Sequence, residues 1–328
     1  MSKLALSIAV GDYDRVRPLV DGHVPIDGVA PTFLLLEPEE IFFRAFRHEE
    51  FDVCELSLSS FTVRTSRGDN PYAGVPVFTS RAFRHTAITV RKDRIRQPKD
   101  LIGKRIGLPE YQLTACVWAR GILAEHGVQP SDVTWVRGGL EQAGRVEKIK
   151  LQLPAGVHIE DAPIDRSLSQ MLETGELDAI VTPRLPSCQV RGAPNIGWLF
   201  DDTRAEAEAW YRRTGVFPIM HLLGVRKSLL ERQPWVAATM LKAFTRSKQV
   251  SAERLADTSA TKVTLPFVED QIVAARALMG DDFWPYGLEP NRKTLEAFLA
   301  LHRDQGLSRG DLRADDLFHP TTWEVSKI

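Results

Sequence analysis

Short apolar runs of strand length alternate with helical segments from the amino terminus onward. The runs are Leu4 to Val10, Thr32 to Leu36 and Phe51 to Leu56. Helical patterns follow each of them, over 13–20, 38–51 and from Ser57. Three consecutive strand–helix units predict a mostly parallel sheet whose faces are covered by helices.

A second set of strand–helix units begins at Gly103 to Gly127. Lys104 to Leu108 predicts a strand, Pro109-Glu110 a turn, and Gln112 to His126 a helix that ends before Gly127. The free backbone N–H groups at such a helix start favour a carboxylate or phosphate, and Tyr111, Gln112 and Thr114 add side-chain donors. The alternative is an ordinary corner in which Thr114 caps the helix.

The remaining pattern predicts two discontinuous α/β lobes. Lobe 1 comprises residues 1–88 and 196–328, and lobe 2 comprises residues 89–195. Further strands are predicted at 133–137, 156–160, 177–182, 198–200 and 217–225, and further helices at 166–173, 203–213, 235–256, 267–279 and 294–302. Two crossings between such lobes predict a hinged cleft, where small ligands are usually bound.

Composition excludes several classes of protein. The 328 residues include 42 basic and 43 acidic side chains, so a nucleic-acid surface is not indicated. The sequence contains no run of about eighteen apolar residues, so a membrane span is not indicated. The segment MSKLALSIAV lacks the parts of a signal peptide, and Cys54, Cys116 and Cys188 form no CxxC pair. We therefore expect a cytoplasmic protein with reduced thiols.

Several longer stretches resemble the 4,5-dihydroxyphthalate decarboxylase family. They are FRHTAITVRKD, DLIGKRIGLPEYQLTACVWARGILAEHGVQPSDVTWVRGG, LETGELDAIVTPRLP, TGVFPIMH and FWPYGLEPNRKTLEAFLALHRDQGL. The resemblance implies a fold like that of type II periplasmic binding proteins. It also implies decarboxylation of a hydroxylated aromatic dicarboxylate, most simply 4,5-dihydroxyphthalate to protocatechuate, in phthalate degradation. No organic cofactor or metal is implied.

That chemistry requires a general acid at the ring carbon that loses CO2 and a base at the phenol. His85, in FRHTA, and His221, in FPIMH, are the candidates, because histidine titrates near neutral pH. Which is acid and which is base stays open, and each could instead be a core histidine. Glu110 could accept the catechol protons, or it could only favour the adjacent helix start.

Arginines and serines are candidates for binding the substrate. Arg184, which follows a buried strand, and Arg81 and Arg84, near the first crossing, could each bind a carboxylate through two hydrogen bonds. The alternative for all three is a solvated surface position. Ser57 and Ser59, at a helix start, could bind the ligand or cap the helix.

Other functions fit parts of the same pattern. A non-catalytic solute-binding or sensing protein for an aromatic carboxylate would share the fold. An enzyme of the thiamine-precursor type would use pyridoxal phosphate on a lysine, but no cysteine-rich or histidine-rich stretch supports it. HExxH is absent, which disfavours a metal-dependent hydrolase. The expected partner is a small aromatic carboxylate, and homo-oligomerisation is left open.

Overall fold

A computed structural model describes residues 3–145, 147 and 149–323 of the chain. The chain divides into two compact units. Unit 1 comprises Met1–Arg81, Ile219–Leu295 and Arg313–Ile328, and unit 2 comprises Ala82–Pro218 and Glu296–Leu312. This discontinuous α/β organisation agrees with the predicted fold class.

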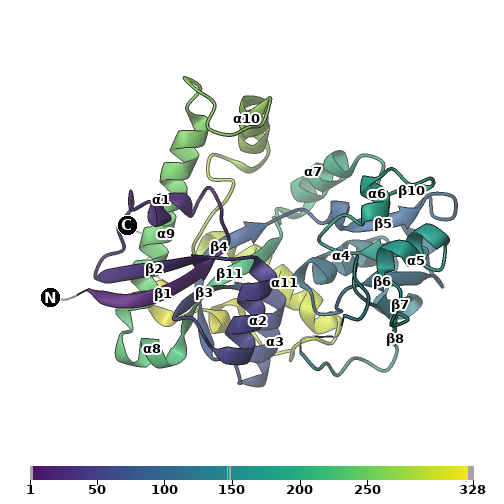
Figure 1. Ribbon diagram of the computed structural model, residues 1–328, viewed down its shortest axis with the longest axis horizontal. Coiled ribbons are helices and arrows are strands. Elements are labelled where there is room, and N and C mark those ends of the chain that lie inside the picture. Colours follow the sequence, from purple (N-terminus) through teal and green to yellow (C-terminus); the bar gives the residue numbers. More distant parts are fainter. Residues whose placement is uncertain (1–2, 146, 148, 324–328) are drawn as a thin grey trace. The chain divides into compact units, whose positions relative to one another are not determined.

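Unit 1 is built on a five-stranded mixed sheet in the order β2-β1-β3-β11-β4. Strands β1 and β2 are parallel, as are β1 and β3, whereas β11 runs antiparallel to both β3 and β4. The strands are β1 Leu4–Val10, β2 Val29–Leu35, β3 Val53–Ser57, β4 Tyr72–Arg81 and β11 Ile219–Arg226 (Figure 1). Strand β11 thus comes late in the sequence but lies between β3 and β4, which both come early.

Helices pack against this sheet. Helices α2 and α3 contact β3 and β11, and the long helix α9 contacts β4. The helices of unit 1 are α1 Arg17–Val20, α2 Pro38–His48, α3 Leu58–Arg67, α8 Lys227–Arg232, α9 Trp235–Ala256 and α10 Val268–Met279, with 3-10 turns η4 Glu289–Asn291, η5 Ala314–Leu317 and η6 Pro320–Thr322. Helix α10 lies beside the carboxyl end of α9 (Figure 1).

Unit 2 is built on a six-stranded mixed sheet in the order β10-β5-β9-β6-β7-β8. The strands are β5 Ile88–Arg91, β6 Arg105–Leu108, β7 Thr134–Arg137, β8 His158–Asp161, β9 Ala179–Val181 and β10 Ile196–Trp198. Its helices are α4 Thr114–Glu125, α5 Leu168–Thr174, α6 Ser187–Val190 and α7 Thr203–Thr214, with η1 His85–Ala87, η2 Pro98–Leu101 and η3 Pro130–Asp132. Helix α11, Arg292–Asp304, begins in unit 1 and continues into unit 2.

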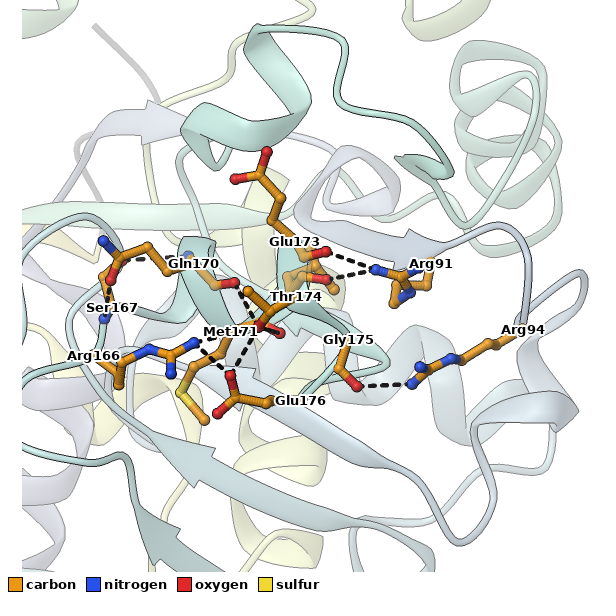
Figure 2. A network of polar contacts seen from close by, with 11 residues as sticks. Arg91, Arg94, Arg166, Ser167, Gln170, Met171, Glu173, Thr174, Gly175 and Glu176 are labelled. Carbon is orange, nitrogen blue, oxygen red and sulfur yellow. Dashed lines mark hydrogen bonds and ion pairs between the residues drawn. The ribbon is translucent and has the colours of Figure 1, made fainter.

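The TGELDAIV stretch starts at the carboxyl end of helix α5, where two arginines at the end of strand β5 and just after it bind backbone carbonyls. Gly175 closes α5 with a left-handed φ of 85°. Arg91 donates to the carbonyls of Leu172 and Glu173 at 3.1 and 2.9 Å, and Arg94 donates to the carbonyl of Gly175 at 2.9 Å (Figure 2). The Leu172 carbonyl also accepts from the Gly175 N–H at 3.2 Å, and a cation suits the negative end of the helix dipole.

The unit boundaries differ from the predicted lobes. Residues 82–88, 196–218 and 296–312 were predicted in lobe 1 but belong to unit 2. Strand β10 pairs with β5, and residues of α11 pack on α4, which explains the difference. The cleft expected between the lobes stays a prediction.

The predicted elements mostly occur, with shifted ends. The helix predicted over 13–20 forms only at Arg17–Val20, where Pro18 stands at its start. The helix predicted from Gln112 begins at Thr114, after an N-cap position at Leu113. Across the described residues, no helix is both long and apolar enough to cross a membrane.

Candidate functional site

A buried glutamate and a histidine form a pair in the sheet of unit 1. Leu223 of β11 lies opposite Glu55 of β3, and His221 lies two residues before Leu223. Alternate residues of a strand share a face, so the Glu55 and His221 side chains are diagonal neighbours on one face of the sheet. His221 Nδ1 and Glu55 Oε1 are 2.6 Å apart. The sheet register therefore sets this contact.

The Glu55 carboxylate has two further donors, both from the loop after β1. The Gly11 N–H donates to Oε2 and the Tyr13 hydroxyl donates to Oε1, each at 2.9 Å. A β-carbon at residue 11 would lie 2.5 Å from Cζ of Tyr13, so only glycine permits this approach. The loop thus completes the shell of donors around Glu55.

The electrostatics of this cluster favour an ionised Glu55. Complete burial alone would raise the carboxyl pKa, but the hydrogen bonds from His221, Gly11 and Tyr13 outweigh it and hold the pKa below its usual range. Burial and the neighbouring Glu55 charge raise the pKa of the Tyr13 hydroxyl far above its ordinary value, so it stays a donor. The carboxylate on Nδ1 orients the His221 ring.

His221 itself is accessible. Its side chain is 19% exposed, whereas that of Glu55 is fully buried. The ring of Phe42 meets the imidazole edge-on, with centroids 4.9 Å apart. With Nδ1 held by Glu55 and the ring held by Phe42, Nε2 is the atom able to exchange a proton with a ligand or with water.

Arginines surround this cluster in unit 1. Arg15 stacks on the rings of Tyr13 and Trp284, at 4.2 and 4.6 Å from their centroids. The predicted clamp Arg81 is buried and donates to the Pro285 carbonyl at 2.9 Å and to the Asn291 side chain. Arg81 therefore already anchors a neighbouring loop through these bonds.

The helix start predicted to bind an anion carries one from the chain itself. The carboxylate of Glu147 accepts the N–H groups of Tyr111 and Gln112, at 3.2 and 3.1 Å. Burial and the nearby Glu110 raise the pKa of Glu147, although the two N–H donors oppose this. Both N–H groups precede α4, which begins at Thr114, so Glu147 occupies only the Gln112 member of the predicted set of donors.

Glu110 and its neighbours form a closed network in unit 2. Glu110 is fully buried and accepts from Arg145 at 2.7 Å and from the Gln112 side chain at 2.9 Å. Tyr111 is also buried, with its ring 3.7 Å from the guanidinium carbon of Arg120. Thr114 is buried and opens α4. The Glu110 carboxylate is thus bound by Arg145 and Gln112, and its role as base stays a prediction.

His85 lies in η1 of unit 2 in an apolar environment. It is 2% exposed and packs against Phe200 and Trp210, with ring centroids 5.5 and 5.9 Å away. Its Nδ1 atom has no hydrogen-bond partner among the described residues. Burial, with a smaller contribution from His126, lowers the pKa of His85 to about 4. At neutral pH this imidazole is uncharged.

The remaining candidates occupy different environments. Loss of hydration lowers the pKa of Arg84 to about 10, whereas Arg184 is exposed. Ser57 and Ser59 are buried; Ser57 occupies the N-cap position of α3 but makes no side-chain capping bond. The expectation that Ser57 caps this helix through its hydroxyl is therefore wrong.

Comparison with known proteins identifies the family. The chain is 57% identical over 330 residues to the 4,5-dihydroxyphthalate decarboxylase of Comamonas testosteroni, covering 100% of both chains. The chain belongs to the 4,5-dihydroxyphthalate decarboxylase family. A relative of the same name from Pseudomonas putida is 61% identical over 214 residues, covering 65% of this chain and 83% of that one. This member of the decarboxylase family is accordingly a carboxy-lyase.

Broader comparisons show the fold of this decarboxylase family. The family model described as NMT1/THI5 like matches residues 74–149. The alkanesulfonate-binding protein SsuA from Xanthomonas axonopodis pv. citri has a TM-score of 0.53 at 14% identity, covering 98% of this chain and 99% of that chain. The periplasmic aliphatic sulphonate binding protein SsuA from Escherichia coli has a TM-score of 0.53 at 12% identity, covering 97% and 92%. The type II periplasmic-binding-protein-like fold is thus confirmed.

Within the decarboxylase family member, the predicted residues fall into two groups. His221, Arg81, Ser57 and Ser59 lie in unit 1, and His85, Arg84, Glu110, Tyr111, Gln112, Thr114 and Arg184 lie in unit 2. Sequence reasoning missed Glu55, Tyr13 and Gly11, which hold His221. A signal for Glu55 was available, since a lone carboxylate in the apolar strand VCELS is rarely buried without a partner.

Proposed function

We propose that this protein removes one carboxylate from 4,5-dihydroxyphthalate to give protocatechuate and CO2, as a step in phthalate degradation in the cytoplasm. The observation that carries the proposal is the Glu55–His221 pair, a proton donor held in orientation within a chain that is 57% identical to a decarboxylase of that name. No cofactor enters the proposed reaction, and the partner is a small aromatic carboxylate.

The chemistry explains why a proton donor is needed. Direct loss of CO2 would leave an anion in the plane of the ring, where the ring electrons cannot delocalise it. Deprotonating the hydroxyl para to the departing carboxylate pushes electron density to the carbon that bears it. A proton added there lets the C–C bond break as the ring regains aromaticity. Each turnover therefore consumes one proton and releases one CO2.

We assign delivery of that proton to His221. The ionised Glu55 holds Nδ1 in place, so that Nε2 presents the proton. The 19% exposure of the His221 side chain allows water to restore the proton after turnover. Glu55 is a positioning residue and Tyr13 and Gly11 hold it. General acid catalysis of this kind typically contributes about a hundredfold to ten-thousandfold.

Two of the predicted arginines stay candidates for binding the substrate. Arg84 and Arg184 are the proposed partners of the substrate carboxylates, since a guanidinium keeps its charge at working pH and bonds a carboxylate twice. Arg184→Ala should then raise KM with a smaller effect on kcat. An unchanged KM in both Arg184→Ala and Arg84→Ala would remove these residues from the proposal.

The test is a direct assay. Purified protein is incubated with 4,5-dihydroxyphthalate, without added metal or cofactor, while protocatechuate and CO2 are measured. We expect both products in equal amounts, and at least an approximately hundredfold lower rate for His221→Ala. His23→Ala, an exposed histidine of the same unit, is the matched control. Substrate binding without product would favour the alternative, a solute-binding or sensing protein.

A further inference from the structure

A pocket of ≈ 200 Å³ lies within unit 1, lined by α9, α10 and the segment 281–284 together with Asp14 and Arg15. Its apolar lining includes Leu255, Ile272 and Phe283, with Trp284 beside them. A dry cavity of about 150 Å³ accepts one benzene molecule. The volume therefore suits a single aromatic ring with small substituents.

The charged lining of the pocket is partly neutralised. Lys248 binds Asp282, with Nζ 2.7 Å from Oδ2, and Arg15 pairs with Asp14 at 3.1 Å. The two charged groups left are Arg276 and Asp281, whose side chains form no ion pair with any described residue. A guanidinium suits a carboxylate and a carboxylate accepts hydroxyl protons, so the pocket offers complementary groups for both.

We propose that this pocket is a second binding site, for a hydroxylated aromatic monocarboxylate, and that the protein's own product occupies it. The choice of product rests on the proposed function, which yields a ring with one carboxylate and two hydroxyls. Arg276 binds the carboxylate, Asp281 accepts from the hydroxyls, and Trp284 and Phe283 contact the ring.

The pocket is connected to the proton donor. Arg15 lines it, stacks on Trp284 and Tyr13, and donates through Nε to the Thr79 carbonyl at 2.9 Å. Tyr13 donates to Glu55 at 2.9 Å, and Glu55 holds His221. A ligand that shifts Arg15 or Trp284 alters the donor shell of Glu55. Bound product therefore lowers kcat and leaves KM nearly unchanged.

Calorimetry of the full chain with protocatechuate as the probe tests the site, and steady-state assays with added protocatechuate test the coupling. Arg276→Ala should weaken one binding event at least about tenfold, the usual size of a charge-assisted hydrogen bond. Ala252→Trp should fill the pocket and abolish that event. Both variants should lose the kcat effect of product and keep the rate measured without product. The control is Arg254→Ala, an exposed arginine on α9, the helix that also carries Ala252.

The outcomes separate this site from the reaction. Unfolding midpoints first establish that Arg276→Ala and Ala252→Trp are folded. If these variants bind protocatechuate and are inhibited by it as the unaltered protein is, the second site is refuted. Binding of benzylamine in place of protocatechuate would refute the carboxylate assignment. If 4,5-dihydroxyphthalate is not decarboxylated while Arg276-dependent protocatechuate binding persists, the proposed function fails and the second site stands.

Discussion

His221 and His85 look alike in the sequence, each set in an apolar stretch, yet the two units surround them differently. His221 has a fully buried carboxylate 2.6 Å from Nδ1 and a side chain that is 19% exposed. His85 is 2% exposed, lies among Phe200 and Trp210, and has a pKa lowered to about 4. Of the two, His221 combines a carboxylate contact with access to solvent, whereas burial disfavours the charged form of His85.

The largest expected effect follows from removing the imidazole that contacts Glu55. His221→Ala should lower kcat at least about a hundredfold, whereas His85→Asn should lower it less than about tenfold. Circular dichroism and thermal unfolding confirm folding, and His23→Ala should match the unaltered protein. Equal losses of kcat in His221→Ala and His85→Asn would contradict this contrast and would indicate that His85 takes part in proton transfer.

A smaller effect is expected from neutralising the partner of His221. Glu55→Gln should lower kcat about tenfold or more and shift the pH dependence of kcat/KM by about one unit. Removing a carboxylate from beside a cationic acid disfavours the charged form of that acid. Because the acid form is the active form, the alkaline limb moves to lower pH. A shift of the acidic limb instead would show that His221 acts as the base.

The loop after β1 gives a finer test. Gly11→Ala places a β-carbon where the Tyr13 ring lies, 2.5 Å from Cζ, and should displace the hydroxyl from Glu55. We expect kcat to fall several-fold, toward the tenfold effect of one lost hydrogen bond to a charged group. Gly156→Ala, whose β-carbon meets only Ser131 at 3.5 Å, is the control. Full activity in Gly11→Ala would remove Tyr13 from the donor shell.

The smallest effect concerns stability. The folded-state pKa of His85 is about 4, below its value of roughly 6.5 in the unfolded chain. The unfolded chain then binds the proton first, so stability is lost as pH falls from about 6.5 toward 4. His85→Phe should remove that part of the loss. Urea unfolding at several pH values measures it, and an unchanged pH dependence would contradict the buried neutral imidazole.

The sequence predicted the architecture well because hydrophobic periodicity and turn residues determine the strands and helices locally. Leu4–Val10 formed as predicted, and Gly175 ends α5 as expected of a left-handed glycine. The site was less accessible to sequence reasoning. His221 was identified, but its contact with Glu55 depends on the register of β3 and β11, which lie far apart in the chain.

The same limit explains the helix start of α4. The pattern indicated free N–H donors at Gln112 to Thr114, but the helix begins at Thr114, and nothing near it in the sequence indicates that Glu147 accepts hydrogen bonds from the Tyr111 and Gln112 N–H groups. Arg81 was likewise recognised as a cation, whereas its bonds to Pro285 and Asn291 depend on a loop some two hundred positions away. Residue type was readable in both cases, and long-range partners were not.

The late position of β11 has a consequence for synthesis on the ribosome. When residue 218 has been made, β3 and β4 exist but the strand that joins them does not, so the sheet of unit 1 is still open. The packing of unit 2 is also incomplete at that point, because Gln305, in the last segment of this unit, binds Arg120 and the carbonyl of Val117. Neither unit can complete its packing before the carboxyl-terminal third emerges, so nascent chains must keep the open sheet of unit 1 from pairing with other chains until translation is nearly complete.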